Sequence, residues 1–140
     1  MTVTFCGHSE LFQAELVHQW LISEVDAAIR DGAEIFFLGG YGGFDAMAAR
    51  VVWEAKKKHP NIKSILVLPY LDKKVDASIY DGTTYPPLEK VPRRFAIAKR
   101  NQWCVDQSDR LIAYVMHDWG GAAATLAYGQ KKGIEIRLYR

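Results

Sequence analysis

The chain lacks any apolar run of the roughly 18 residues that a membrane-spanning helix requires. Its first residues carry no basic segment ahead of an apolar one, so they do not resemble a secretory signal peptide. Only two cysteines occur, Cys6 and Cys104, which are far apart and outside any CxxC pattern. Because isolated reduced thiols are usual in the cytosol, we expect a cytoplasmic protein that contacts no membrane.

The chain also lacks an excess of charge of one sign and any cluster of metal-binding residues. The 18 basic and 16 acidic residues leave a formal net charge of +2, so a nucleic-acid partner is not expected. No group of Cys, His and carboxylate residues has metal-ligand spacing, and we expect no metal and no resident cofactor. Neither a Ser/His/Asp order nor a carboxylate pair stands out, so the sequence assigns no catalytic residue.

What the sequence does contain is an alternation of strand and helix signals over one domain, residues 1–140. Apolar residues make up 49% of the chain, as in ordinary globular proteins. Periodicity predicts helices over residues 10–31, 44–58, 93–106 and 122–132. Short β-rich runs predict strands over residues 2–6, 34–38, 62–68, 110–115 and 134–139. This alternation predicts an α/β fold, a three-layer Rossmann-like sandwich around a mostly parallel sheet of about five strands.

One glycine-rich stretch, Gly39–Gly43, stands where an apolar strand meets a helix. Glycine allows positive φ and close approach of a ligand to the backbone. The helix start beyond it offers unpaired N–H groups, which favour phosphate. The alternative is a tight turn that merely needs glycine.

Two further strand ends carry short motifs, Gly7-His8 and Gly120-Gly121. Ligands of open α/β sheets bind at the carboxyl ends of the strands, so we expect these motifs and Gly39–Gly43 to meet at one site. A 24-residue segment, 69–92, leaves from a fourth strand end and is long enough to form a rim or lid. Residues 77–80 are its candidate strand, and its tyrosines could stack on a base or pin the segment to the core.

Arg100 is the most informative charged residue. Ile97, Arg100, Asn101 and Cys104 recur at the spacing of one helix face. An arginine on a partly apolar face needs a buried partner, and one aimed at the strand ends would bind an anion. The alternative is a structural ion pair with an acid such as Asp45.

The remaining candidates each have a structural reading as well. Asp45 could contact a ribose hydroxyl or simply favour a helix start. His8 could contact ligand, and Thr125 could donate to phosphate or pack within its helix. Residues 117–119 precede the paired glycines and could line the rim. The candidate ligand-binding residues are therefore Gly7, His8, Gly39, Gly40, Gly42, Gly43, Asp45, Arg100, Asn101, Gly120, Gly121 and Thr125.

Together these motifs resemble the SLOG superfamily, the Rossmann-like group that includes LOG-type nucleotide hydrolases and the DNA-processing protein DprA. The chain looks closest to the small YpsA-like bacterial branch. The resemblance rests on residues 5–8, 39–45 with 48–49, 100–106, 108–109, 111–114, and 120–121 with Thr125. It implies a nucleotide-derived ligand at the glycine-lined strand ends and, as is common in the superfamily, a homo-oligomer. LOG-type members carry glutamates after the paired glycines, whereas this chain has Ala122–Ala124 there.

Three functional hypotheses follow. The first is a domain that binds or senses a nucleotide-like small molecule. The second is a nucleoside-monophosphate N-glycosidase, which the missing glutamates disfavour because glycosidic cleavage needs a carboxylate at the sugar. The third is a DprA-like DNA-binding module, which the weak net charge and the absence of a basic stripe disfavour.

Overall fold

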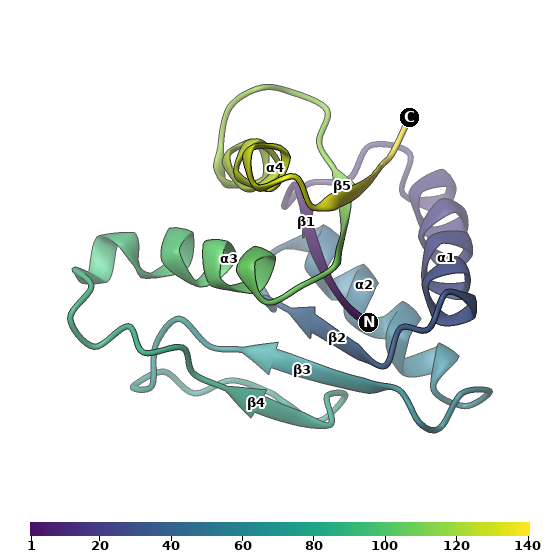
Figure 1. Ribbon diagram of the computed structural model, residues 1–140, viewed down its shortest axis with the longest axis horizontal. Coiled ribbons are helices and arrows are strands. Elements are labelled where there is room, and N and C mark those ends of the chain that lie inside the picture. The colour runs from purple at the N-terminus through teal and green to yellow at the C-terminus, as the bar shows by residue number, and fades with distance from the viewer.

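The computed structural model describes residues 1–140 as one parallel sheet between two layers of helices (Figure 1). The strands are β1 (Thr2–Gly7), β2 (Ile35–Leu38), β3 (Lys63–Val67), β4 (Gly82–Thr84), β5 (Arg110–Tyr114) and β6 (Glu135–Leu138). The helices are α1 (Ala14–Arg30), α2 (Gly43–Ala55), α3 (Ala96–Asp106) and α4 (Gly121–Lys132), with a short 3-10 helix, η1 (Arg93–Phe95), before α3. The predicted α/β, Rossmann-like fold is confirmed. None of the helices combines the length and apolar character needed to span a membrane.

The sheet has the strand order β4-β3-β2-β1-β5-β6, and every neighbouring pair is parallel. The chain moves outward from β1 to β4 and then returns to the other side of β1 with β5, so the switch point lies between β1 and β5. The sixth strand, β4, was not predicted, because three residues are too few for a periodic signal. Residues 77–80 form a turn rather than the candidate strand.

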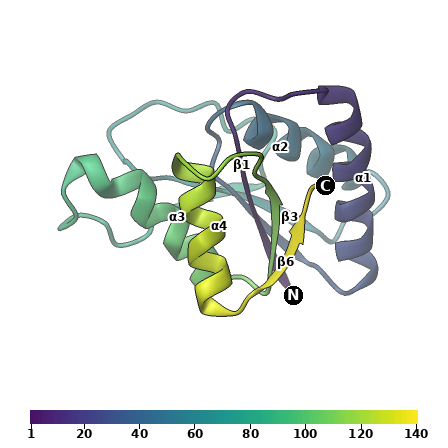
Figure 2. The same ribbon diagram turned by 90° about the horizontal axis from the view of Figure 1, so that it is seen from above.

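Alternation along the strands divides the core between the two faces of the sheet. Val3 and Phe5 of β1 pack with the buried side of α1 and α2. Cys6 packs instead with Val105 of α3 and with Leu111 of β5. Figure 2 shows α3 and α4 on the opposite side of β1 from α1. Both faces of the central strands are thus covered, which explains their nearly continuous apolar sequences.

The first helix is shorter than its sequence pattern predicted. It begins at Ala14 rather than near Glu10, after Gln13, whose φ of 54° is the only positive value outside glycine. The Phe12 N–H donates to the Tyr114 hydroxyl at 2.9 Å, and the Ser9 carbonyl accepts from the Gly43 N–H. These contacts hold residues 9–12 as a loop across the carboxyl edge of the sheet.

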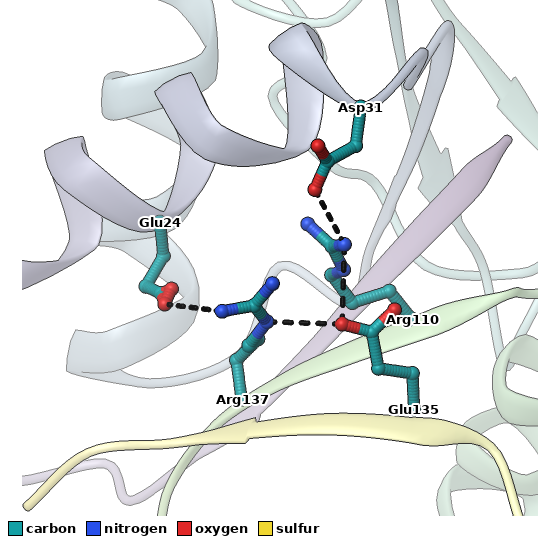
Figure 3. A network of polar contacts seen from close by, with 5 residues as sticks. All are labelled: Glu24, Asp31, Arg110, Glu135 and Arg137. Carbon is teal, nitrogen blue, oxygen red and sulfur yellow. Dashed lines mark hydrogen bonds and ion pairs between the residues drawn. The ribbon is translucent and has the colours of Figure 1, made fainter.

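An ion-pair network fastens the opposite, amino-terminal edge (Figure 3). Arg110, which begins β5 and is 4% exposed, donates from Nη2 to Asp31 at 2.7 Å and lies 3.1 Å from Glu135. Arg137 links Glu135, at 3.0 Å, with Glu24 of α1, at 3.8 Å. The network joins α1, β5 and β6 and leaves the carboxyl edge free for a site.

Candidate functional site

The candidate site is a cavity of about 790 Å³ at the carboxyl edge, beside the switch point between β1 and β5. Its size lies in the range of small-molecule sites. Nine of the twelve predicted ligand-binding residues line it: Gly7, His8, Gly39, Asp45, Arg100, Asn101, Gly120, Gly121 and Thr125. The α3 face predicted from residue spacing is also present, because Ile97 and Cys104 line the cavity beside Arg100.

The first N–H groups of α2 are hydrogen-bonded to a loop of the protein itself, residues 8–9. Gly42, its N-cap, has φ 89° and ψ 176°. The Gly43 N–H donates to the Ser9 carbonyl at 2.8 Å, and the Phe44 N–H donates to the His8 carbonyl at 3.3 Å. A Cβ at Gly43 would lie only 2.4 Å from the Ser9 carbonyl oxygen. Glycine is therefore needed here to pack against the loop, and Gly42 and Gly43 do not line the cavity.

Gly40 also lies outside the large cavity. It has φ +70°, and a Cβ there would meet the Leu66 side chain at 2.6 Å. Gly40 lines a second cavity of about 300 Å³, together with residues of the 69–92 segment such as Asp76 and Tyr80. No residue of that segment lines the large cavity, so the expected rim or lid is not formed over it in this structure.

The start of α4 is open, although its backbone matches that of α2. Gly120, its N-cap, has φ 90° and ψ 178°. The N–H groups of Gly121, Ala122 and Ala123 have no acceptor within the protein, because the first helical bond runs from the Ala124 N–H to the Gly120 carbonyl. A Cβ at Gly120 or Gly121 would meet nothing within 4 Å. Gly121 and Ala122 line the cavity, so the positive helix end and free N–H donors lie beside it.

Arg100 is 2% exposed and lines the cavity from α3. Its Nη1 donates to the carbonyls of Gly39, at 2.9 Å, and Val67, at 2.7 Å, and its Nε donates to Asn101 Oδ1 at 2.8 Å. It forms no ion pair with Asp45, contrary to the structural alternative considered for it. Nη2 makes no hydrogen bond in the protein. The guanidinium thus ties the ends of β2 and β3 together and keeps donor capacity for an anion.

Asp45 approaches the same strand end from the first turn of α2. Its Oδ2 accepts from the Tyr41 N–H at 3.2 Å. Burial raises the pKa of Asp45 to about 6, partly opposed by this hydrogen bond and by Arg100. A Cβ at Gly39 would lie 2.9 Å from Asp45 Oδ2 and 3.2 Å from Arg100 Cζ. Gly39 therefore gives the carboxylate and the guanidinium room beside the strand.

Thr125 lines the cavity but uses its hydroxyl within the helix. The Oγ1 hydroxyl donates to the Gly121 carbonyl at 2.9 Å, one helical turn earlier, and the residue is 6% exposed. This is the packing role considered as an alternative to phosphate donation.

Three aromatic rings stack along one wall of the cavity. The centroids of His8 and His117 are 3.8 Å apart at 18°, and those of His117 and Trp119 are 3.8 Å apart at 15°. His8 Nε2 accepts from the Met116 N–H at 2.8 Å. Burial, with a smaller contribution from His117, lowers the pKa of His8, which favours this neutral acceptor form. The sequence indicated His117 and Trp119 together as rim residues and His8 as a separate candidate, since nothing in their spacing indicates stacking.

Other cavity residues escaped sequence reasoning. Exposed rings at the rim come from Phe12, which the pattern assigned to a helix, and from Tyr41 between the glycines. The tyrosines of the 69–92 segment, which were considered for base stacking, lie elsewhere: Tyr80 packs against the core, and the Tyr70 ring lies under the Arg93 guanidinium at 4.2 Å.

Comparisons with known proteins agree with this fold. No protein-family model matches the chain. UPF0398 proteins of Bacillus thuringiensis (strain Al Hakam) and Bacillus cereus (strain Q1) are each 26% identical over 140 residues, covering 89% of this chain and 74% of the relative. Membership of the SLOG superfamily and of its YpsA-like branch stays a prediction.

Two solved structures share the fold at low sequence identity. DNA processing protein A from Helicobacter pylori, described with a single-stranded DNA binding mode, has a TM-score of 0.69 at 16% identity, covering 99% of this chain. DNA processing protein A from Streptococcus pneumoniae has a TM-score of 0.67 at 15% identity, covering 98%. This chain spans only 64% and 49% of those two chains.

Proposed function

We propose that this protein binds or senses a nucleotide-like small molecule in the large cavity. The observation that carries the proposal is the presence of the open α4 start and the buried Arg100 at one cavity. Arg100 Nη2 makes no hydrogen bond within the protein and is not among the polar atoms sealed inside it, so it can donate to a ligand in the cavity. A phosphate would supply an acceptor for this donor.

The proposed ligand has a phosphate at one end and polar groups further in. The free N–H groups of residues 121–123 suit phosphate oxygens, and Arg100 adds a full positive charge. Asp45 could accept hydrogen bonds from ribose hydroxyls when ionised. The exposed rings at the rim favour a flat apolar group over a purely polar sugar.

Ligand-induced stabilisation tests the proposal. AMP, ADP-ribose and ribose 5-phosphate are each added, and the melting temperature is expected to rise with concentration for at least one of them. Gly121→Val should abolish the shift, because its side chain would enter open space beside the helix start without disturbing packing. Arg100→Ala should also abolish it, whereas Lys99→Ala, an exposed neighbour on α3, should not. Absence of any shift across the panel would refute the proposal.

One specific observation supports the alternative that the protein is an N-glycosidase. Asp45 places a carboxyl in the cavity with a pKa of about 6, suited to proton transfer near neutral pH. The alanines at 122–124 still leave the site without the LOG-type glutamates. This alternative predicts release of free base from AMP that is lost in Asp45→Asn. Chromatography that detects no base from any common nucleotide would exclude it.

Single-stranded DNA binding is the third candidate function, despite the low net charge. The Helicobacter neighbour is described with that activity, and cations here stack on aromatic rings: the Arg94 guanidinium lies 4.7 Å from the centre of the Phe95 ring, beside Arg93 over Tyr70. Cationic and aromatic groups together suit single strands. Fluorescence anisotropy with a labelled oligonucleotide should then show salt-sensitive binding that Arg93→Ala/Arg94→Ala weakens. No binding at low salt would exclude this candidate.

A further inference from the structure

The stack of His8, His117 and Trp119 is a built feature rather than a chance contact. Its members come from two neighbouring strand ends, because Gly7 of β1 pairs with Tyr114 of β5. The Met116 N–H holds His8 at its Nε2, and the buried Tyr114 ring meets His8 edge-on at 5.7 Å. The inner end of the stack is therefore fixed, and the outer end is Trp119.

Trp119 is 69% exposed even though one face of its ring rests on His117. A single exposed ring is common on a protein surface, but Trp119 lines the same cavity as two other exposed rings, those of Phe12 and Tyr41, and apolar groups gathered at a cavity mark a binding site. The ring lines the large cavity and directly precedes Gly120 and Gly121 at the open start of α4. A flat ring stacked on Trp119 would continue a series that is already spaced at 3.8 Å.

We propose that Trp119 is the stacking platform for the nucleobase of the bound ligand, with the His8–His117 pair as its rigid support. This inference rests on the proposed nucleotide-binding function and adds which end of the cavity holds the base. The support is fixed in advance, so stacking a base costs little ordering of the protein. A purine covers more of the indole than a pyrimidine does, and purine nucleotides should bind more tightly.

Calorimetric titration of AMP, UMP and ribose 5-phosphate against wild type and variants tests the inference. Base–aromatic stacking energies correspond to a loss of about 5- to 140-fold in affinity when the platform is removed. Trp119→Ala should lower the affinity for AMP by this factor and leave the affinity for ribose 5-phosphate unchanged. Trp119→Phe should retain part of the affinity for AMP. Trp53→Ala is the matched control, since Trp53 lies on α2 outside the cavity.

The outcomes separate this inference from the proposed function. If AMP and ribose 5-phosphate bind wild type equally, or if Trp119→Ala binds AMP as wild type does, the platform is refuted while nucleotide binding stands. If no compound binds, both fail. Binding of an oligonucleotide but of no mononucleotide would overturn the inference in favour of a nucleic-acid surface. A Trp119-dependent AMP affinity with unchanged ribose 5-phosphate affinity supports it.

Discussion

Substituting alanine at the first residue of α2 should destabilise the protein, whereas the same substitution at the first residue of α4 should not. Gly43 and Gly121 follow N-cap glycines with nearly the same φ and ψ, and neither of the two has a positive φ itself. Gly43→Ala would place a methyl group 2.4 Å from the Ser9 carbonyl oxygen. Gly121→Ala would place one in open space. The pair therefore isolates the effect of the loop that covers α2.

The magnitudes follow from packing and helix propensity. Overpacking costs about 1–3 kcal/mol, and disturbing the Gly43 N–H bond to Ser9 adds roughly 1 kcal/mol. Alanine regains up to about 1 kcal/mol over glycine in a helix. Gly43→Ala should thus lower the free energy of unfolding by about 1–3 kcal/mol. Gly121→Ala should leave it unchanged or raise it by up to about 1 kcal/mol.

Urea unfolding followed by far-ultraviolet circular dichroism measures both variants against wild type. The midpoint of Gly43→Ala should fall with an unchanged slope, which indicates a change in native stability rather than in the unfolded state. If the two variants have unfolding free energies within about 0.5 kcal/mol of each other, a value typical of substitutions at unremarkable surface sites, the inferred difference between the glycine loops is wrong.

Two further predictions concern charged residues. Arg110→Met should lower the free energy of unfolding by about 1–3 kcal/mol. This is less than the cost of breaking a fully buried ion pair, because Asp31 and Glu135 are half-exposed and can rehydrate. Arg137→Met should lower it by less than about 1 kcal/mol, and equal losses for the two variants in urea unfolding would contradict this prediction. Asp45 has a pKa of about 6 in the folded protein against 3.8 in the unfolded chain. Burial of its ionised carboxylate therefore destabilises the folded state, and this destabilisation is absent below pH 3.8 and grows as the pH rises to about 6. Asp45→Asn should therefore stabilise the protein by about 1–3 kcal/mol at pH 7.5 and by little at pH 4; a pH-independent effect in thermal unfolding would count against the burial of Asp45.

The fold was largely predictable because its signals are local. Apolar strands alternate with amphipathic helices, and parallel order follows from that alternation. The errors occur where distant contacts override local preference. α1 begins late because residues 9–12 bond to Tyr114 and to the start of α2, which lie far away in the sequence. β4 has three residues and exists only because β3 offers a free edge.

The residues that line the cavity were more predictable than the contacts they make. The spacing of Arg100 on its helix indicated a face directed at the strand ends, and that face lines the cavity. Its partners were not predictable, because backbone carbonyls such as those of Gly39 and Val67 leave no mark in a sequence. The stacking of His8 on His117 depends on the adjacency of β1 and β5, and only the strand order reveals it.

The difference between the two glycine loops limits how a ligand can be held. Two glycine-capped helix starts would favour a ligand with a phosphate bound at each of them. A helix start attracts phosphate, however, only while its N–H groups are free. At α2 the Ser9 and His8 carbonyls already accept from the first two N–H groups, whereas at α4 the corresponding donors remain free. The cavity therefore offers a ligand two positive features, the free helix start of α4 and the guanidinium of Arg100. Such an arrangement suits a ligand with its phosphate at one end and its base on Trp119, and it argues against a molecule anchored by phosphates at both loops.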